Sequence, residues 1–301
     1  MDLDRIDATG TIADGTRMGA VELLVKDLDL MLAYYRDVLA LDLIRVDGDT
    51  HVLGRGGIET MSLTPARDLP GRRRTDAGLY HTAILFDDKP GLAAAVARVA
   101  HSGLGRYVGS ADHLVSEAIY FDDPEGNGVE LYVDRDRENW RRNLEGKPLM
   151  GVEWLDVNRL LDEHLTEQEF AKPSAVASVG HVHLQVGDIP VARKFYAGVL
   201  GFDVIFDMGA ALFVSAGGYH HHIGLNTWHS RGAGPRAAAL GLGQMDIVLP
   251  TADDVEALRD RLRLAGVSAA DDGATLTFPD PWGSQIRVRV DARTTREPAR
   301  D

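Results

Sequence analysis

One carboxylate stands inside an apolar segment of the sequence, and its chemistry needs an explanation. Glu130 lies in residues 129–133, where alternation predicts a strand with Glu130 and Tyr132 on one face and apolar residues on the other. Residues 118–122 predict a partner strand, and Asp-Pro-Glu-Gly at 123–126 predicts a tight turn between them. A buried carboxylate is costly without a cation, a charged partner or a proton. Glu130 therefore indicates either a compensated buried site or an edge strand that leaves it in water.

Two histidines lie at comparable strand positions. His81 lies in one predicted strand, which continues over 82–86, and His181 opens another over 181–186. A lone strand histidine is usually structural, but two imidazoles and Glu130 on neighbouring strands would form a facial triad suited to non-haem Fe(II). The 301 residues include no cysteine, which excludes disulfides, iron–sulfur clusters and zinc–thiolate sites. Any metal would be held by histidine and carboxylate.

These strands belong to an internal repeat. Residues 18–28 match 179–189 at an offset of 161 positions, and residues 78–85 and 123–126 parallel 241–248 and 280–283. The chain therefore contains four related units, which we name A1, B1, A2 and B2 in chain order. Each unit is predicted as one strand, one helix and several further strands. We expect an α+β fold in which the four βαβββ units pair into two cupped mixed-sheet modules.

The predicted domain division follows the repeat. Residues 13–135 form an N-terminal module of two units, residues 136–176 a connector, and residues 177–291 a C-terminal module of two units. Helices are predicted over 91–103 in B1 and over 154–165 in the connector. The polar ends, residues 1–15 and 292–301, are expected to be loosely ordered.

The repeat also limits which units can share a metal. B1 carries His81 and Glu130, and A2 carries His181. In the other copies the equivalent positions hold residues that do not complete a triad: Ala20, Gln244 and Arg287. One metal bound by all three ligands would require B1 to pair with A2, and A1 with B2. The pairing could occur within one chain, which we favour, or by exchange of modules between two chains.

A second concentration of histidines follows two glycines. His220, His221 and His222 fall in a predicted strand over 220–225, where alternation would separate His221 from its two neighbours. An imidazole facing the cup would suit acid–base chemistry, because its charge changes near neutral pH. A surface metal-binding cluster is the alternative, and the sequence leaves open which of the three faces the metal.

Composition limits the partners. A net charge of −14 argues against nucleic acid, and the one basic run, Arg72-Arg73-Arg74, is expected to be solvated surface. No apolar segment approaches 18 residues, and the N-terminus lacks the pattern of a signal peptide, so we expect a cytoplasmic protein with no membrane contact. The remaining histidines without a partner pattern are expected to be surface or incidental: His51, His101, His164 and His229.

From about residue 18 to residue 290, the sequence resembles the vicinal oxygen chelate superfamily of glyoxalases, antibiotic resistance proteins and type I extradiol dioxygenases. More narrowly, it resembles the two-domain catechol 2,3-dioxygenases. Their pattern of a histidine, an apolar-Tyr pair, Asp-Pro-x-Gly and a glutamate is met by His113, Ile119-Tyr120, residues 123–126 and Glu130. Ala111 is the one departure from that pattern.

The resemblance implies roles for these residues. His81, Glu130 and His181 would bind Fe(II), with Mn(II) as the alternative metal. His221 would act as the acid–base residue, while Tyr120 and His113 would hydrogen-bond the oxygenated substrate. The reaction would cleave a catechol outside its two hydroxyls with O2, and the protein could assemble as a homo-oligomer. Most extradiol enzymes keep all three ligands in one domain, whereas here B1 and A2 share them.

Two other functions share this fold. A glyoxalase-like isomerase or lyase would use Ni, Zn or Mn with four protein ligands, and could recruit Glu59 if A1 paired with B1. A metal-free binding protein would hold a small molecule in the same cup. Phe213, Tyr219 and Trp228 would suit a planar ligand, although strand aromatics are more often core.

Overall fold

The computed structural model describes residues 10–291. In chain order its elements are β1 (Arg17–Val25), α1 (Leu28–Leu32), η2 (Ala33–Val38), β2 (Asp42–Asp47), β3 (Thr50–Arg55), β4 (Ile58–Pro65), β5 (Gly78–Phe86), α2 (Lys89–Ser102), β6 (Arg106–Asp112), β7 (Ser116–Asp122), β8 (Gly128–Asp134), η3 (Arg137–Asn139), α3 (Val157–His164), α4 (Glu167–Ala171), β9 (Ala177–Gln185), α5 (Ile189–Arg193), η4 (Lys194–Val199), β10 (Asp203–Asp207), β11 (Ala211–Ser215), β12 (Ile223–Asn226), β13 (Gly241–Leu249), α6 (Ala252–Leu264), β14 (Ala270–Asp271), β15 (Thr275–Pro279) and β16 (Gln285–Val290).

The strands form two eight-stranded mixed sheets. Their orders are β10-β11-β12-β9-β5-β8-β7-β6 and β14-β15-β16-β13-β1-β4-β3-β2. Within every unit the first strand pairs parallel with the fourth, and the remaining neighbours are antiparallel. Four βαβββ units in two sheets confirm the predicted α+β fold.

The sheets join units from opposite sides of the connector. β5 of B1 pairs antiparallel with β9 of A2, and β1 of A1 pairs antiparallel with β13 of B2. The structure therefore adopts the B1–A2 pairing within one chain. The modules at 13–135 and 177–291 are divisions of the sequence, and each sheet takes one unit from each of them.

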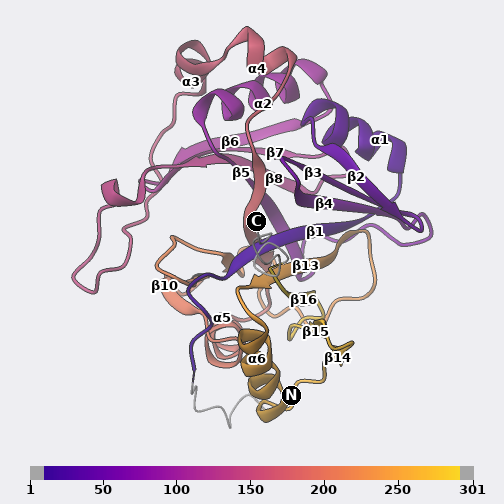
Figure 1. Ribbon diagram of the computed structural model, residues 1–301, viewed down its shortest axis with the longest axis vertical. Helices are drawn as coiled ribbons and strands as arrows, with labels where there is room; N and C mark the ends of the chain where they lie inside the picture. The colour runs from indigo at the N-terminus through magenta and orange to yellow at the C-terminus, as the bar shows by residue number, and fades with distance from the viewer. Residues whose placement is uncertain (1–9, 292–301) are drawn as a thin grey trace, which may run out of the picture.

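Figure 1 shows how the two halves of the chain are arranged. Helices α1 to α4 gather at the top of the view, and α5 and α6 lie at the bottom, with strands between them. In the connector, α3 and α4 pack against α2. One large apolar core draws residues from all four units. No helix in the described part of the chain is long and apolar enough to cross a membrane.

A buried tyrosine–aspartate hydrogen bond links A1 to B1 in the first half of the chain, and another links A2 to B2 in the second half. Tyr35 of A1 donates its hydroxyl to Asp123 of B1 at 3.0 Å, and Tyr196 of A2 donates to Asp280 of B2 at 2.9 Å. Both aspartates begin an Asp-Pro-x-Gly turn, and backbone N–H groups of the same turns also donate to them. Burial raises the pKa of each aspartate to about 6, against the opposing effect of these donors. The bonds link units that lie in different sheets.

Removing either tyrosine hydroxyl should destabilise the fold without touching the cup. We expect Tyr35→Phe to lower the free energy of unfolding by about 2 kcal/mol, because a buried carboxylate loses a donor. Tyr196→Phe is the matched variant and should cost a similar amount. Urea unfolding at neutral pH measures both. A loss below about 0.5 kcal/mol in both variants would show that the bonds do not stabilise the fold.

Three predicted boundaries need correction. The connector helix begins at Val157, three residues later than expected, because the Asp156 side chain caps it by accepting from Arg159 N. β12 begins at Ile223, so the three histidines precede the strand. The expectation of loose order over residues 1–15 is wrong where the structure describes them, since Ile12 is buried and donates its N–H to Gly201 O at 2.8 Å. Residues 1–9 and 292–301 lie outside the described residues.

Candidate metal centre and active site

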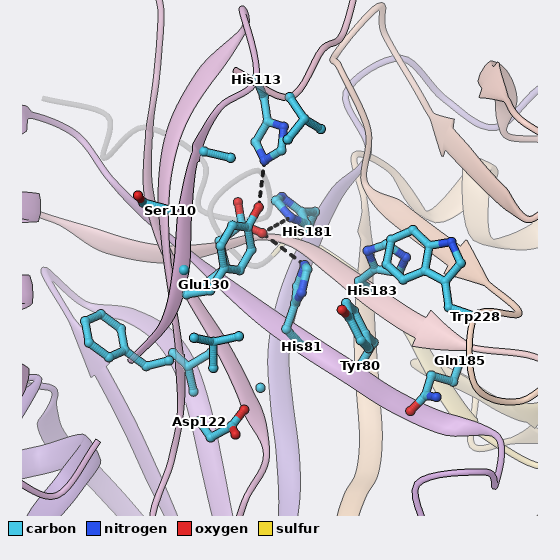
Figure 2. Close-up of a pocket in the computed structure, with 18 of the residues that line it drawn as sticks. Tyr80, His81, Ser110, His113, Asp122, Glu130, His181, His183, Gln185 and Trp228 are labelled. Atoms are coloured by element: carbon cyan, nitrogen blue, oxygen red, sulfur yellow. Dashed lines mark hydrogen bonds and ion pairs between the residues drawn. The ribbon is translucent and has the colours of Figure 1, made fainter. Parts of the chain in front are cut away.

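His81, Glu130 and His181 meet in the cup of the B1–A2 sheet. They come from the adjacent strands β5, β8 and β9. The Nε2 atoms of His81 and His181 lie 3.0 Å and 3.1 Å from the same oxygen, Glu130 Oε2. One potential ligand atom from each residue lies within 4.8 Å of the other two, and all three side chains are buried. Figure 2 shows both histidines directed at the carboxylate.

The electrostatics of this cluster favour a charged Glu130 carboxylate and a neutral His181 imidazole. Burial by itself would raise the pKa of Glu130, but the charge and hydrogen bond of His181, together with the nearby His81, hold it well below its usual range. Burial lowers the pKa of His181 to about 4, against the opposing effect of Glu130. β8 is an interior strand and Glu130 is 2% exposed, so the alternative of an edge strand in water is wrong.

The donor set fits a metal ion. His81 Nε2 is buried and close to Glu130 Oε2, yet its geometry falls short of a hydrogen bond. Two imidazole nitrogens therefore converge on one carboxylate oxygen, and only His181 is aligned for a hydrogen bond to it, an arrangement that ligands of a common cation would show. Two imidazoles and one carboxylate on a single open face are the donor set of non-haem Fe(II) sites.

The second cup, in the A1–B2 sheet, holds ion pairs instead. Arg287 donates to both oxygens of the buried Asp246, at 2.9 Å and 2.6 Å. Gln244 Nε2 donates to the same carboxylate at 3.3 Å. Glu59 lies on β4 of this sheet and pairs with Arg45, so it does not join the cluster around Glu130. The four-ligand set that a glyoxalase-like site would draw from Glu59 is absent among the described residues.

His113 and Tyr120 form a second polar pair beside the cluster. His113 Nδ1 lies 2.8 Å from Gly151 O, which can only accept, so Nδ1 carries a proton. Nε2 of the neutral ring then accepts from the Tyr120 hydroxyl at 2.7 Å. Burial, and after it the charge of Glu130, raises the pKa of Tyr120 well above its ordinary value. Tyr120 is therefore a neutral hydroxyl donor at the cavity.

The three consecutive histidines adopt a geometry that alternation does not describe. Gly217 and Gly218 have φ values of 57° and 66°, and this turn precedes β12. The Nδ1 atoms of His220 and His221 lie 2.8 Å apart, so the predicted separation of these side chains onto opposite faces is wrong. The His221 ring lies 4.0 Å from the His181 ring, centroid to centroid, and lines the cavity.

The partners of His220 determine the protonation pattern of His221. His220 Nε2 lies 2.9 Å from the Asp134 carboxylate, which only accepts, so a neutral His220 is protonated at Nε2. Its Nδ1 must then accept from His221 Nδ1–H. The remaining nitrogen of His221, Nε2, keeps a free lone pair. Asp134 and His220 therefore orient His221 as a base.

His222 has a different environment, and its titration should affect stability. Its Nδ1 accepts from Ala216 N–H at 3.2 Å, and burial, followed by the like charges of His220 and Arg137, lowers its pKa to about 3. The unfolded chain, with a pKa near 6.5, therefore binds more protons below pH 6.5, and stability is lost as the pH falls.

We expect His222→Asn to reduce the acid loss of stability. The wild type should lose about 3 kcal/mol more than this variant between pH 7 and pH 4. Urea unfolding at the two pH values measures the difference, and His51→Asn, in β3 of the other sheet, is the control. Equal pH dependence in wild type and His222→Asn would contradict the assignment.

A cavity of about 980 Å³ opens over the cluster. Its wall includes His113, Tyr120 and His221, together with the aromatic rings of Tyr80, His183, Phe213 and Trp228. Of the three aromatics singled out in the sequence, Phe213 and Trp228 line it, whereas Tyr219 packs with Val115 and Trp140.

Sequence reasoning missed several lining residues. His183 lies two positions after His181 and shares its face of β9. Strand alternation alone would have predicted this shared face. Arg72 and Arg74 also line the cavity. Arg72 is half-buried, which corrects the expectation of solvated surface at that residue, whereas Arg73 and Arg74 are exposed as expected. His229 is exposed as expected but lies at the cavity and contacts Arg74.

Comparison with known proteins places the chain in a family. A family model described as the Glyoxalase/Bleomycin resistance protein/Dioxygenase superfamily matches residues 17–131 and 178–288. The chain belongs to this superfamily. It is 37% identical over 278 residues to catechol-2,3-dioxygenase of Bacillus subtilis (strain 168), covering 90% of this chain and 96% of that protein. It is 27% identical over 129 residues to biphenyl-2,3-diol 1,2-dioxygenase 3 of Rhodococcus globerulus, covering 41% and 68%.

Solved structures share the superfamily fold at low identity. Glyoxalase I from Zea mays aligns with a TM-score of 0.56 at 18% identity, covering 92% of each chain. A protein of Bacillus subtilis subsp. subtilis str. 168 aligns with a TM-score of 0.63 at 14% identity, covering 94% of this chain and 87% of the other. The superfamily inferred from the sequence is confirmed, and these structures support its two-sheet fold.

Proposed function

We propose that this protein is an extradiol dioxygenase that cleaves catechol or a substituted catechol with O2, using Fe(II) held by His81, Glu130 and His181. The observation that carries the proposal is the convergence of these three side chains in the wall of a cavity. The similarity to a catechol-2,3-dioxygenase along 90% of the chain supports the same reaction class.

The metal would bring diol and O2 together and lower the pKa of the bound diol. The chain's own residues manage the protons. His221 Nε2 accepts a proton from a diol hydroxyl, and His220 and Asp134 stabilise the imidazolium that results. This proton returns from His221 to an oxygen of the product as the ring opens.

His113 and Tyr120 act on the opposite side of the substrate. The Tyr120 hydroxyl, which donates to His113 Nε2, can turn to donate to a substrate oxygen. The contact with Gly151 O fixes the His113 ring, whose Nε2 positions the Tyr120 hydroxyl. The Tyr120 hydroxyl thus stabilises negative charge that develops on oxygen.

The test is anaerobic reconstitution followed by oxygen. Metal-free protein is loaded with Fe(II), Mn(II), Zn(II) or Ni(II), given catechol, and then exposed to O2. We expect one metal per chain, O2 uptake equal to catechol loss, and a yellow ring-opened product with Fe(II) or Mn(II). Isomerisation of a hemithioacetal with Ni(II) or Zn(II) and no O2 uptake would establish the glyoxalase-like alternative. Failure of all four metals to bind would overturn the proposal in favour of a metal-free binding protein.

A further inference from the structure

The cavity extends well beyond the three candidate ligands. Building on the proposed function, we infer that the natural substrate is an anionic catechol whose side chain carries a carboxylate. The diol ring would occupy the end at Glu130, and the carboxylate would bind Arg74, with Arg72 behind it, at the opposite end. An unsubstituted catechol would leave most of the roughly 980 Å³ unfilled, since this volume is near the upper limit for small-molecule sites.

The two arginines lack an acidic partner in the described part of the chain. Arg72 donates to Asp76 O at 3.1 Å, to Leu79 O at 2.8 Å and to Gln185 Oε1 at 2.8 Å, all neutral oxygens. Arg74 Nη2 donates to His229 Nε2 at 3.0 Å, which requires a neutral imidazole. Burial, followed by the like charge of Arg236 and opposed by Asp76, lowers the pKa of Arg72. An added anion would be stabilised there.

Strand β9 sets the distance between the two ends. His181, His183 and Gln185 alternate onto one face, and all three line the cavity. His181 contacts Glu130, while Gln185 bonds the Arg72 side chain and the Arg74 carbonyl. Four residues of strand span about 13 Å, so the carboxylate must lie well away from the diol. A carboxylate attached directly to the ring, or one carbon away, would not reach.

Aromatic side chains line the cavity between its metal-binding end and its arginine end. The rings of His183, Tyr80 and Trp228 pack against one another, with centroid separations of 5.1 Å for His183–Tyr80, 5.5 Å for His183–Trp228 and 5.3 Å for Tyr80–Trp228. Figure 2 shows Tyr80 and His183 between His81 and Gln185, with Trp228 on the same side as Gln185. Such a wall fits an apolar linker or a second ring. The cavity therefore presents a metal-binding end, an apolar middle and a cationic end.

Arg106 provides an internal comparison. It lines the same cavity and is exposed, as Arg74 is, but its guanidinium pairs with Asp122. Its charge is already compensated, whereas those of Arg72 and Arg74 are not. In a chain of net charge −14, two cations without acidic partners at one cavity are best explained by an anionic ligand.

The test compares an acid with its neutral ester. The probes are 5-(3,4-dihydroxyphenyl)pentanoate, its methyl ester and the shorter 3,4-dihydroxyphenylacetate, assayed with Fe(II)-loaded protein. We expect kcat/KM for the long acid to exceed that for the ester by about tenfold. Arg74→Gln should remove this preference, whereas the control Arg106→Gln should keep it. The short acid should show no advantage over its own ester.

Equal kcat/KM for the long acid and its ester in the wild type would overturn the inference, as would an unchanged preference in Arg74→Gln. A preference for the short acid would place the anion nearer the metal and overturn the assigned position. Calorimetric titration with 5-phenylpentanoate, which needs neither metal nor turnover, separates the two proposals. Suppose that Arg74→Gln weakens this binding about tenfold and that no catechol is cleaved. The anion site would then be retained, and only the dioxygenase function would be rejected.

Discussion

Glu130→Gln is expected to abolish both metal binding and ring cleavage. Glutamine keeps the shape of the side chain but removes the charge on which His81 and His181 converge. We expect the metal content to fall from one per chain to near zero and kcat to fall on the order of a thousandfold or more, about 4 kcal/mol of lost transition-state stabilisation. Metal analysis and O2 uptake measure the two effects.

The matched control is Glu59→Gln in the other sheet. Glu59 pairs with Arg45 away from the cavity, so this variant should keep full metal content and activity. Thermal unfolding adds a third measurement, because a ligand that binds the folded state raises the melting temperature. Fe(II) should raise the melting temperature of the wild type and of Glu59→Gln but not that of Glu130→Gln. Stoichiometric metal and normal turnover in Glu130→Gln would remove Glu130 from the ligand set.

His221→Ala is expected to separate metal binding from catalysis. The variant should keep one metal per chain, because His221 lies outside the three-residue cluster. We expect kcat to fall about 10²- to 10⁴-fold, the usual contribution of a positioned acid–base group, with a smaller change in KM. Steady-state O2 uptake measures both constants. His51→Ala, in the other sheet, should behave as wild type.

Asp134 and His220 form a hydrogen-bonded chain that ends at His221, so a substitution at Asp134 tests whether this chain orients His221. Asp134→Asn can donate to His220 Nε2 and so allows the other tautomer, in which His221 Nδ1 loses its acceptor. We expect kcat to fall about a hundredfold with metal content and KM nearly unchanged. Wild-type kcat in Asp134→Asn would mean that His220 does not orient His221. Wild-type ring cleavage in His221→Ala would remove His221 from the mechanism.

The sequence determined the fold and the three candidate ligands. The equivalent positions of the other copies hold Ala20, Gln244 and Arg287, so one metal bound by all three ligands already required B1 and A2 to meet. Strand alternation was enough to place Glu130 and Tyr132 on one face, since successive side chains of a strand point to opposite sides. These inferences needed only local periodicity and internal comparison.

Other features depended on residues far apart in the chain. Asp134 contacts His220 across 86 positions, and Arg74 contacts His229 across 155. No local pattern links such pairs, because their proximity depends on how whole strands and loops pack. The direction of the three histidines was likewise set by a turn with two left-handed glycines, where strand alternation no longer applies.

Periodicity and the repeat therefore established which units pair and which side chains share a strand face. Only the tertiary structure decided that the pairing lies within one chain, because an exchange of modules between two chains would make the same contacts. It also decided which groups surround His221 and where the uncompensated arginines lie. Those features arise from contacts of loops with other loops or with strand ends, and loops carry no repeating side-chain pattern from which such contacts can be inferred.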